Sequence, residues 1–175
     1  TGSEQGARKA ESKSPYDFIL DGIFTLSLKT NTGNMVCPPE VGQPSSSTCY
    51  LYFGHLCDSD EINELSFKRM VYSHIDEMLH IYATHLFDSD YLLWIYQKKD
   101  AYFYNIFKKD YASNFKWEKE NISFTKGNIE DWNESNTVKY NNLSIGEFQV
   151  HKNRNCYKFR FNLTNLVKIM EAQNI

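Results

Sequence analysis

The stretch from Ser14 to Asn31 reads SPYDFILDGIFTLSLKTN, and it decides the fold that we expect for this sequence. Its two arms, residues 16–19 and 23–29, are rich in aromatic and β-branched side chains, as strands are. Asp21-Gly22 between two such arms is a strong signal for a tight turn. We therefore predict a β-hairpin here, and the length of its turn determines which side chains share a face.

Two lengths are possible for this turn. A two-residue loop, Asp21-Gly22, would place Asp17 and Lys29 on opposite faces, because side chains alternate along a strand. A three-residue loop, Leu20 to Gly22, pairs Ile19 with Ile23 instead. That register collects polar and apolar residues on separate faces: Asp17, Thr25, Ser27 and Lys29 on one, and Phe18, Phe24, Leu26 and Leu28 on the other. We adopt it and expect the apolar face to be core.

A carboxylate on one strand and x-Lys on the next resembles the site of the PD-(D/E)xK nucleases. Pro15-Tyr16-Asp17 is similar to the Pro-Asp half with one residue inserted, and Ser27-Leu28-Lys29 to the (D/E)xK half with Ser in place of the acid. Lys29-Thr30-Asn31 looks like the continuation found in many type II restriction endonucleases. The resemblance implies an α/β (α+β) fold with a mixed central sheet flanked by helices. The alternative is an ordinary edge hairpin with a surface salt bridge.

The resemblance also implies roles for single residues. Asp17 anchors a Mg²⁺ ion, for which Mn²⁺ can substitute, and the carbonyl of Leu28 adds an oxygen ligand. Lys29 stabilises the phosphate charge and helps to orient or deprotonate the attacking water. Glu40 is the nearest candidate for a second carboxylate, catalytic and metal-binding, with Glu4 or Glu11 as weaker alternatives.

A second candidate region is Gly146–Phe161, GEFQVHKNRNCYKFRF, which looks like the late strands of some restriction enzymes. Arg pairs with guanine, and Asn or Gln with adenine, and a two-stranded ribbon fits the major groove. The alternative is a polar turn on an edge hairpin. The residues expected to contact double-stranded DNA are Ser27, Asn31, Gln43, Ser45, Gln149, His151, Asn153, Arg154, Asn155, Lys158 and Arg160.

The charge distribution is uneven, although the net charge of the 175 residues is only −3. Residues 50–90 hold eight acidic and two basic side chains, whereas residues 139–168 hold six basic and one acidic. Such a basic stripe can supply phosphate contacts, and a plain solvated face is the alternative. We expect one nuclease domain, 1–175, with a catalytic core at 14–110 and a β-rich region at 114–175.

Four cysteines without a CxxC pair, and no signal peptide, predict a reduced protein of the bacterial cytoplasm. No apolar run of about 18 residues predicts a membrane span. We expect helices over 48–56 after a serine N-cap, over 58–87 with a cap at Ser59 or Asp60, and over 163–172. Strands are expected at 91–96, buried on both faces, and at 101–107, 122–124, 137–140, 143–151 and 156–162. His74, His80 and His85 lack a shared metal-binding spacing, which favours structural roles.

Taken together, the sequence predicts a type II site-specific deoxyribonuclease that uses Mg²⁺. A palindromic recognition site would favour a two-fold homodimer. Two alternatives stay open at this point. One is a repair or structure-selective nuclease of the same superfamily. The other is a non-catalytic domain that binds nucleic acid or protein.

Overall fold

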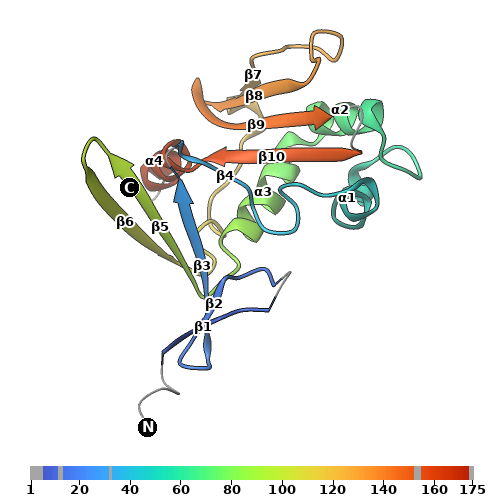
Figure 1. Cartoon of the computed structure of the whole chain (residues 1–175). Coiled ribbons are helices and arrows are strands. Elements are labelled where there is room, and N and C mark those ends of the chain that lie inside the picture. The colour runs from blue at the N-terminus through green and yellow to red at the C-terminus, as the bar shows by residue number, and fades with distance from the viewer. Residues whose placement is uncertain (1–5, 12–13, 32, 152–154, 174–175) are drawn as a thin grey trace.

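The computed structural model describes residues 6–11, 14–31, 33–151 and 155–173, without the side chain of Asn31. These residues form ten strands in two five-stranded sheets, together with four α-helices (Figure 1). The first sheet has the order β1-β2-β3-β5-β6 and the second β4-β10-β9-β8-β7. The predicted combination of a mixed sheet with flanking helices is confirmed. The second, separate sheet was not foreseen.

The first sheet is mixed. Its strands are β1 (Ala7–Lys9), β2 (Phe18–Leu20), β3 (Phe24–Asn31), β5 (Tyr91–Lys98) and β6 (Ala101–Lys108). Only β3 and β5 run parallel, and every other pair is antiparallel. The starts of the two parallel strands are joined by Asp90, whose Oδ2 accepts hydrogen bonds of 2.8 Å from both the backbone N–H and the hydroxyl of Thr25. This contact fixes the register on which the position of Lys29 depends.

The β2–β3 hairpin has a three-residue loop, as predicted, but one residue further along the chain. Leu20 pairs with Phe24, so the loop is residues 21–23, and the predicted pairing of Ile19 with Ile23 is wrong by two residues. Both Asp21 and Gly22 adopt positive φ angles, of 50° and 70°, which places the turn there. Two residues are one full period of a strand, so the predicted grouping of side chains into two faces survives the shift.

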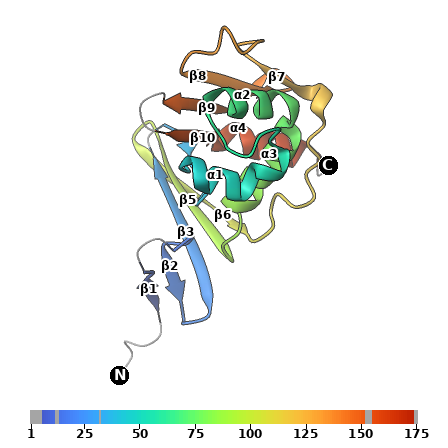
Figure 2. The same cartoon turned by 90° about the vertical axis from the view of Figure 1, so that its right-hand side faces the viewer.

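The burial of these two faces is the reverse of the prediction. Ser27 is 1% exposed and shares its face with Leu92 and Phe107, which are 0% and 6% exposed; we call this the inner face. The opposite, outer face leaves Phe24 43% exposed. Figures 1 and 2 show the helices and the second sheet on one side of the first sheet. The prediction failed because Leu92 and Trp94 of β5 and Phe107 of β6 pack on the Ser27 face, and one sheet face is common to all its strands. For the same reason β5 is central, as predicted, but buried on one face only.

The second sheet is antiparallel throughout. It comprises β4 (Met35–Val36), β7 (Ile122–Phe124), β8 (Ser135–Tyr140), β9 (Leu143–His151) and β10 (Cys156–Asn162). The predicted hairpin turn at Asn141-Asn142 is confirmed, with φ angles of 48° and 65°. The late strands match the prediction to within two residues, because their apolar and polar side chains alternate strictly. The rings on one face of β10 are buried, and Lys158 and Arg160 lie on the other face.

The helices are α1 (Ser46–Phe53), α2 (Glu64–Ser73), α3 (Ile75–Leu86) and α4 (Leu163–Gln173), with short 3-10 turns at Gly54–Leu56 and Lys119–Asn121. Ser45 caps α1, as predicted. The single helix predicted over 58–87 is wrong. Residues 58–63 precede α2, and Asn63, rather than Ser59 or Asp60, forms its N-terminal capping box. The chain breaks again at His74, between α2 and α3.

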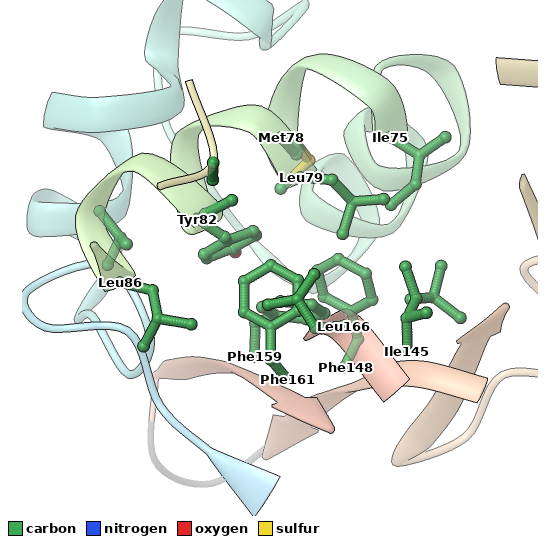
Figure 3. Packing of buried hydrophobic residues seen from close by; sticks show 14 of the residues in the cluster. Ile75, Met78, Leu79, Tyr82, Leu86, Ile145, Phe148, Phe159, Phe161 and Leu166 are labelled. Atoms are coloured by element: carbon green, nitrogen blue, oxygen red, sulfur yellow. The ribbon is translucent and has the colours of Figure 1, made fainter. Parts of the chain in front are cut away.

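The core lies between α3, α4 and the second sheet. Figure 3 shows Met78, Leu79 and Tyr82 of α3 pointing toward the rings of Phe148 and Phe159. The ring of Tyr82 stacks on that of Phe159, with centroids 4.4 Å apart. All of these side chains are at most 1% exposed, so β10 is held rigidly from its buried side. The cationic residues on its other side therefore have a fixed support.

Candidate functional site

The loop that follows β4 brings the two predicted functional regions side by side. Along β10, the N–H of Phe159 donates to Gly42 O at 2.8 Å and the N–H of Tyr157 donates to Pro44 O at 3.3 Å. A Cβ at Gly42 would lie 2.4 Å from the carbonyl oxygen of Pro38, so only glycine fits this tight turn. Residues 38–45 therefore lie along β10 as a continuation of β4. The sequence pattern contains no signal for this contact, because it joins segments more than a hundred residues apart.

Three cations converge beneath this loop. Burial raises the pKa of the Cys37 thiol, and the charges of Lys158, Arg160 and Lys29, in that order, act against the rise. The pairing of Val36 with Phe161 brings Cys37 to the strand that carries Lys158 and Arg160, and Lys29 lies on the same sheet face as the buried Ser27. We call Lys29, Lys158 and Arg160 the cationic cluster. It unites the lysine of the SLK motif with two residues predicted to bind DNA, from opposite ends of the sequence.

Glu147 orients one member of the cationic cluster. Its Oε1 accepts a 2.8 Å bond from Arg160 Nη2 and a 2.6 Å bond from Gln149 Nε2. Gln149 is itself opposite Lys158 in the β9–β10 register. The Nε of Arg160 is buried and has no hydrogen-bond partner among the described residues. The strand alternation could have revealed Glu147, since it places this acid opposite Arg160, but the sequence analysis did not single it out.

Asp17 lies just before β2 and binds the backbone of β3. Its N–H donates to Leu26 O at 2.9 Å, and its Oδ2 accepts a 2.7 Å bond from the N–H of Leu28. The N–H and C=O of one strand residue point to the same edge of the strand, so the Leu28 carbonyl lies on the side of Asp17. One carboxylate and one carbonyl thus meet next to Lys29. That Asp17 and Lys29 project from one sheet face stays a prediction.

Glu40 has partners of its own. It lies 3.4 Å, Oε2 to Nδ1, from His85 of α3. Burial, followed by the charge of Glu40 and a hydrogen bond to it, raises the pKa of Tyr52 in α1. The carboxylate therefore links the loop to two helices. The sequence analysis missed His85 and Tyr52 as partners of Glu40.

The donor set fits Mg²⁺ in part. Mg²⁺ commonly takes one or two carboxylates together with water and substrate phosphates, and Asp17 with the Leu28 carbonyl offers such a start. Across residues 6–11, 14–31, 33–151 and 155–173, no group of three or more His, Cys, Asp or Glu side chains is arranged to hold a metal ion. The role of Glu40 as a metal ligand stays a prediction. Glu11 is exposed, and Glu4 lies outside the described residues.

The other predicted DNA contacts differ in their surroundings. The burial of Ser27 does not favour a DNA contact, and Ser45 is engaged as the α1 cap. Asn155 accepts hydrogen bonds from Ser46 and Tyr157, so its amide oxygen is already occupied. Gln43 is exposed beside β10, and His151 is half-buried at the end of β9. Asn153, Arg154 and the side chain of Asn31 lie outside the described residues.

Two general features of the chain concern the cysteines and the lengths of the helices. All four cysteines carry free thiols. Within the described residues, no helix combines the length and the apolar character that crossing a bilayer requires. The predicted location in a bacterial cytoplasm and the division of the chain at about residue 110 stay predictions.

Comparison with known proteins links this chain to one restriction enzyme. It is 28% identical over 156 residues to the type II restriction enzyme CviAII of Paramecium bursaria Chlorella virus 1. The match covers 87% of this chain but 43% of the relative, so the chain spans less than half of the relative's length. No family model and no solved structure matches the chain. The matched part is therefore similar to a portion of a restriction endonuclease.

Proposed function

We propose that this chain is the nuclease domain of a Mg²⁺-dependent endonuclease of the PD-(D/E)xK type, which hydrolyses double-stranded DNA as a sequence-specific type II restriction enzyme. The observation that carries the proposal is the 2.7 Å hydrogen bond from the Leu28 N–H to the Asp17 carboxylate, which lies beside the lysine of the SLK motif. The similarity to a type II restriction enzyme over most of the chain supports it independently.

The cationic cluster is suited to a phosphodiester. Lys158 and Arg160 hold the DNA backbone, since contacts to phosphate position a duplex without reading its sequence. Lys29 binds the oxygen on which charge develops and orients the attacking water. Glu147 keeps the Arg160 guanidinium in place through the 2.8 Å ion pair. Asp17 and the Leu28 carbonyl would hold the metal ion, which lowers the pKa of a bound water and polarises the phosphate.

The decisive experiment is cleavage of phage DNA by the purified chain with Mg²⁺, Mn²⁺ or a chelator. We expect discrete fragments with either metal and intact DNA with the chelator. A smear would indicate a nuclease without sequence specificity. Intact DNA together with a gel shift would make the chain a binding domain and refute the catalytic proposal.

Two substitutions test the roles of the residues. Lys29→Ala should lower cleavage by at least about a hundredfold, because one preorganised charge is worth roughly 3–4 kcal/mol in the transition state. Asp17→Asn keeps an oxygen that can accept from Leu28 N–H but removes the charge that holds a metal, and should lose cleavage at nearly unchanged melting temperature. Lys108→Ala, on the exposed outer face of the same sheet, is the matched control. Wild-type rates for both Lys29 and Asp17 variants would refute the site.

Glu40 needs its own test, since it contacts His85 and Tyr52. Glu40→Gln preserves the shape and hydrogen-bonding capacity of the side chain. Loss of cleavage with an unchanged melting temperature would support the predicted second carboxylate. A lower melting temperature with cleavage retained would assign Glu40 to the packing of the loop.

We also propose that two copies associate through the outer face. Tyr102, Tyr104 and Ile106 of β6 are 75%, 69% and 58% exposed there, and Phe24 of β3 is 43% exposed on the same face. At about 200 Å² for a large side chain, these four expose roughly 500 Å² of mostly apolar surface, a size that marks interfaces. A standard interface needs about 800 Å² per partner, and the half-buried neighbours on β3 and β5 extend the patch. Among the described strand residues this face carries no acid, and the exposed Lys108 lies at the end of β6.

Light scattering coupled to gel filtration tests the dimer. We expect twice the chain mass of 20.5 kDa at micromolar concentration. Ile106→Lys should yield monomers, whereas Leu51→Lys, at an exposed apolar position on α1, should leave the dimer intact. A monomeric wild type would refute the proposal.

A further inference from the structure

A cavity of about 460 Å³ lies between the inner face of the first sheet and α4. Its wall includes Trp94 and Tyr96 of β5, whose rings are stacked with centroids 4.3 Å apart and planes 26° from parallel. The ring of Tyr96 stacks in turn on Phe103 of β6, at 5.7 Å and 22°. Trp94 and Tyr96 line the cavity itself, and Phe103 supports the ring of Tyr96 from outside the lining. Such a surface suits a flat aromatic ligand.

The wall of the cavity holds one buried donor and one amide. Trp94 is 2% exposed, and its Nε1 has no hydrogen-bond partner among the described residues. This donor is closed off from the cavity, because the nitrogen has almost no accessible surface. Asn105 lies opposite Trp94 in the β5–β6 register and lines the same cavity. Its amide can both donate and accept, which is the pairing chemistry of a nucleobase edge.

The rim of the cavity is mainly cationic. Lys98, at the end of β5, and Lys168 of α4 are exposed lining residues, and Glu171 is the acid beside them. Two ammonium groups at the mouth of an aromatic cavity can hold a phosphate while the base enters. The position also relates to the candidate site, because Trp94 pairs with Lys29 across β3 and β5. Trp94, which lines the cavity, is therefore the neighbour of Lys29 in the first sheet.

We infer that this cavity binds one nucleobase of the DNA, turned out of the duplex, with its 5′-phosphate between Lys98 and Lys168. The inference rests on the proposed nuclease function and adds a base-binding pocket to it. Extrusion of a base loses its stacking and pairing, and the aromatic wall of the cavity with the Asn105 amide offers replacements. The base is recognised inside this pocket, and this recognition is separate from contacts to base edges in the grooves of the DNA.

Calorimetric titration of the intact chain with the four deoxynucleoside 5′-monophosphates tests the pocket. We expect saturable binding of at least one, and about tenfold or more weaker binding of deoxyribose 5-phosphate, which lacks the base. Asn105→Leu should weaken nucleotide binding about tenfold, while Asn133→Leu, in an exposed loop, should leave it unchanged. Equal binding of deoxyribose 5-phosphate, no effect of Asn105→Leu, or no binding at all would overturn the inference.

Two further measurements connect the pocket to DNA and separate it from catalysis. A duplex with one mismatch should bind wild-type protein more tightly than the matched duplex, because a mismatched base leaves the stack at lower cost. This preference should disappear in Asn105→Leu, and its persistence would count against the pocket. Metal-dependent cleavage without nucleotide binding would overturn the pocket and leave the nuclease standing. Nucleotide binding without cleavage would do the reverse.

Discussion

Ser27→Ala is expected to stabilise the protein, although it alters the SLK motif. The Ser27 side chain is 1% exposed, and its Oγ has no hydrogen-bond partner among the described residues. An unsatisfied buried polar group costs about 1–3 kcal/mol, and alanine removes that oxygen without adding volume. For a domain of this size, 1 kcal/mol corresponds to roughly 2–4 °C in melting temperature. We therefore expect a rise of about 2–10 °C by differential scanning calorimetry.

The control for this prediction is Ser123→Ala, at an exposed position in the middle of β7. It should change stability by no more than about 0.5 kcal/mol. A fall in melting temperature for Ser27→Ala would mean that the hydroxyl has a partner in the folded protein, and would refute the reasoning. Retained cleavage in the stabilised variant would also remove Ser27 from the predicted DNA contacts.

Gly146→Ala should destabilise the protein by about 1–3 kcal/mol or more, because the added Cβ would lie 2.7 Å from the ring of Phe159; urea unfolding measures the loss, and an unchanged midpoint would show that the ring can yield. Asp90→Asn should cost about 1 kcal/mol at pH 7, given how exposed the contact is. In the wild type, the pKa of the Asp90 carboxyl is lowered first by the backbone N–H and then by the hydroxyl of Thr25. The stabilisation is therefore complete above the ordinary carboxyl pKa of about 4, and it disappears as the pH falls through the lower pKa of the folded state. Melting curves of wild type and variant should therefore differ at pH 7 and converge in strong acid, and a constant difference would contradict the assignment.

Local patterns predicted most of the secondary structure. Alternation of apolar and polar side chains indicated both late strands and the buried rings of β10, and Asp21-Gly22 indicated the hairpin. The ends of the helices were harder to predict from the sequence. Ser59 and Asp60 are good N-cap residues by type, but Asn63 satisfies the helix because Ser66 completes its capping box. Which of several nearby caps is used depends on the packing of the chain before it.

Long-range packing explains the remaining differences. The side of β3 that becomes core depends on Leu92, Trp94 and Phe107, which lie more than sixty residues away. The same holds for the site. Lys29 could be singled out from SLK, but its proximity to Lys158 and Arg160 depends on the docking of residues 38–45 against β10. Local sequence patterns do not predict that contact.

The pairing of β4 with β10 also has a kinetic consequence. Val36 pairs with Phe161, so closing this ladder encloses a loop of about 125 residues. Non-local closures of this kind slow folding, because the entropy of the enclosed chain is lost before the contact is gained. Lys29 meets Lys158 and Arg160 only after that closure. A chain in which only the local hairpins have formed therefore lacks the cationic cluster, so this charged surface is completed late in folding.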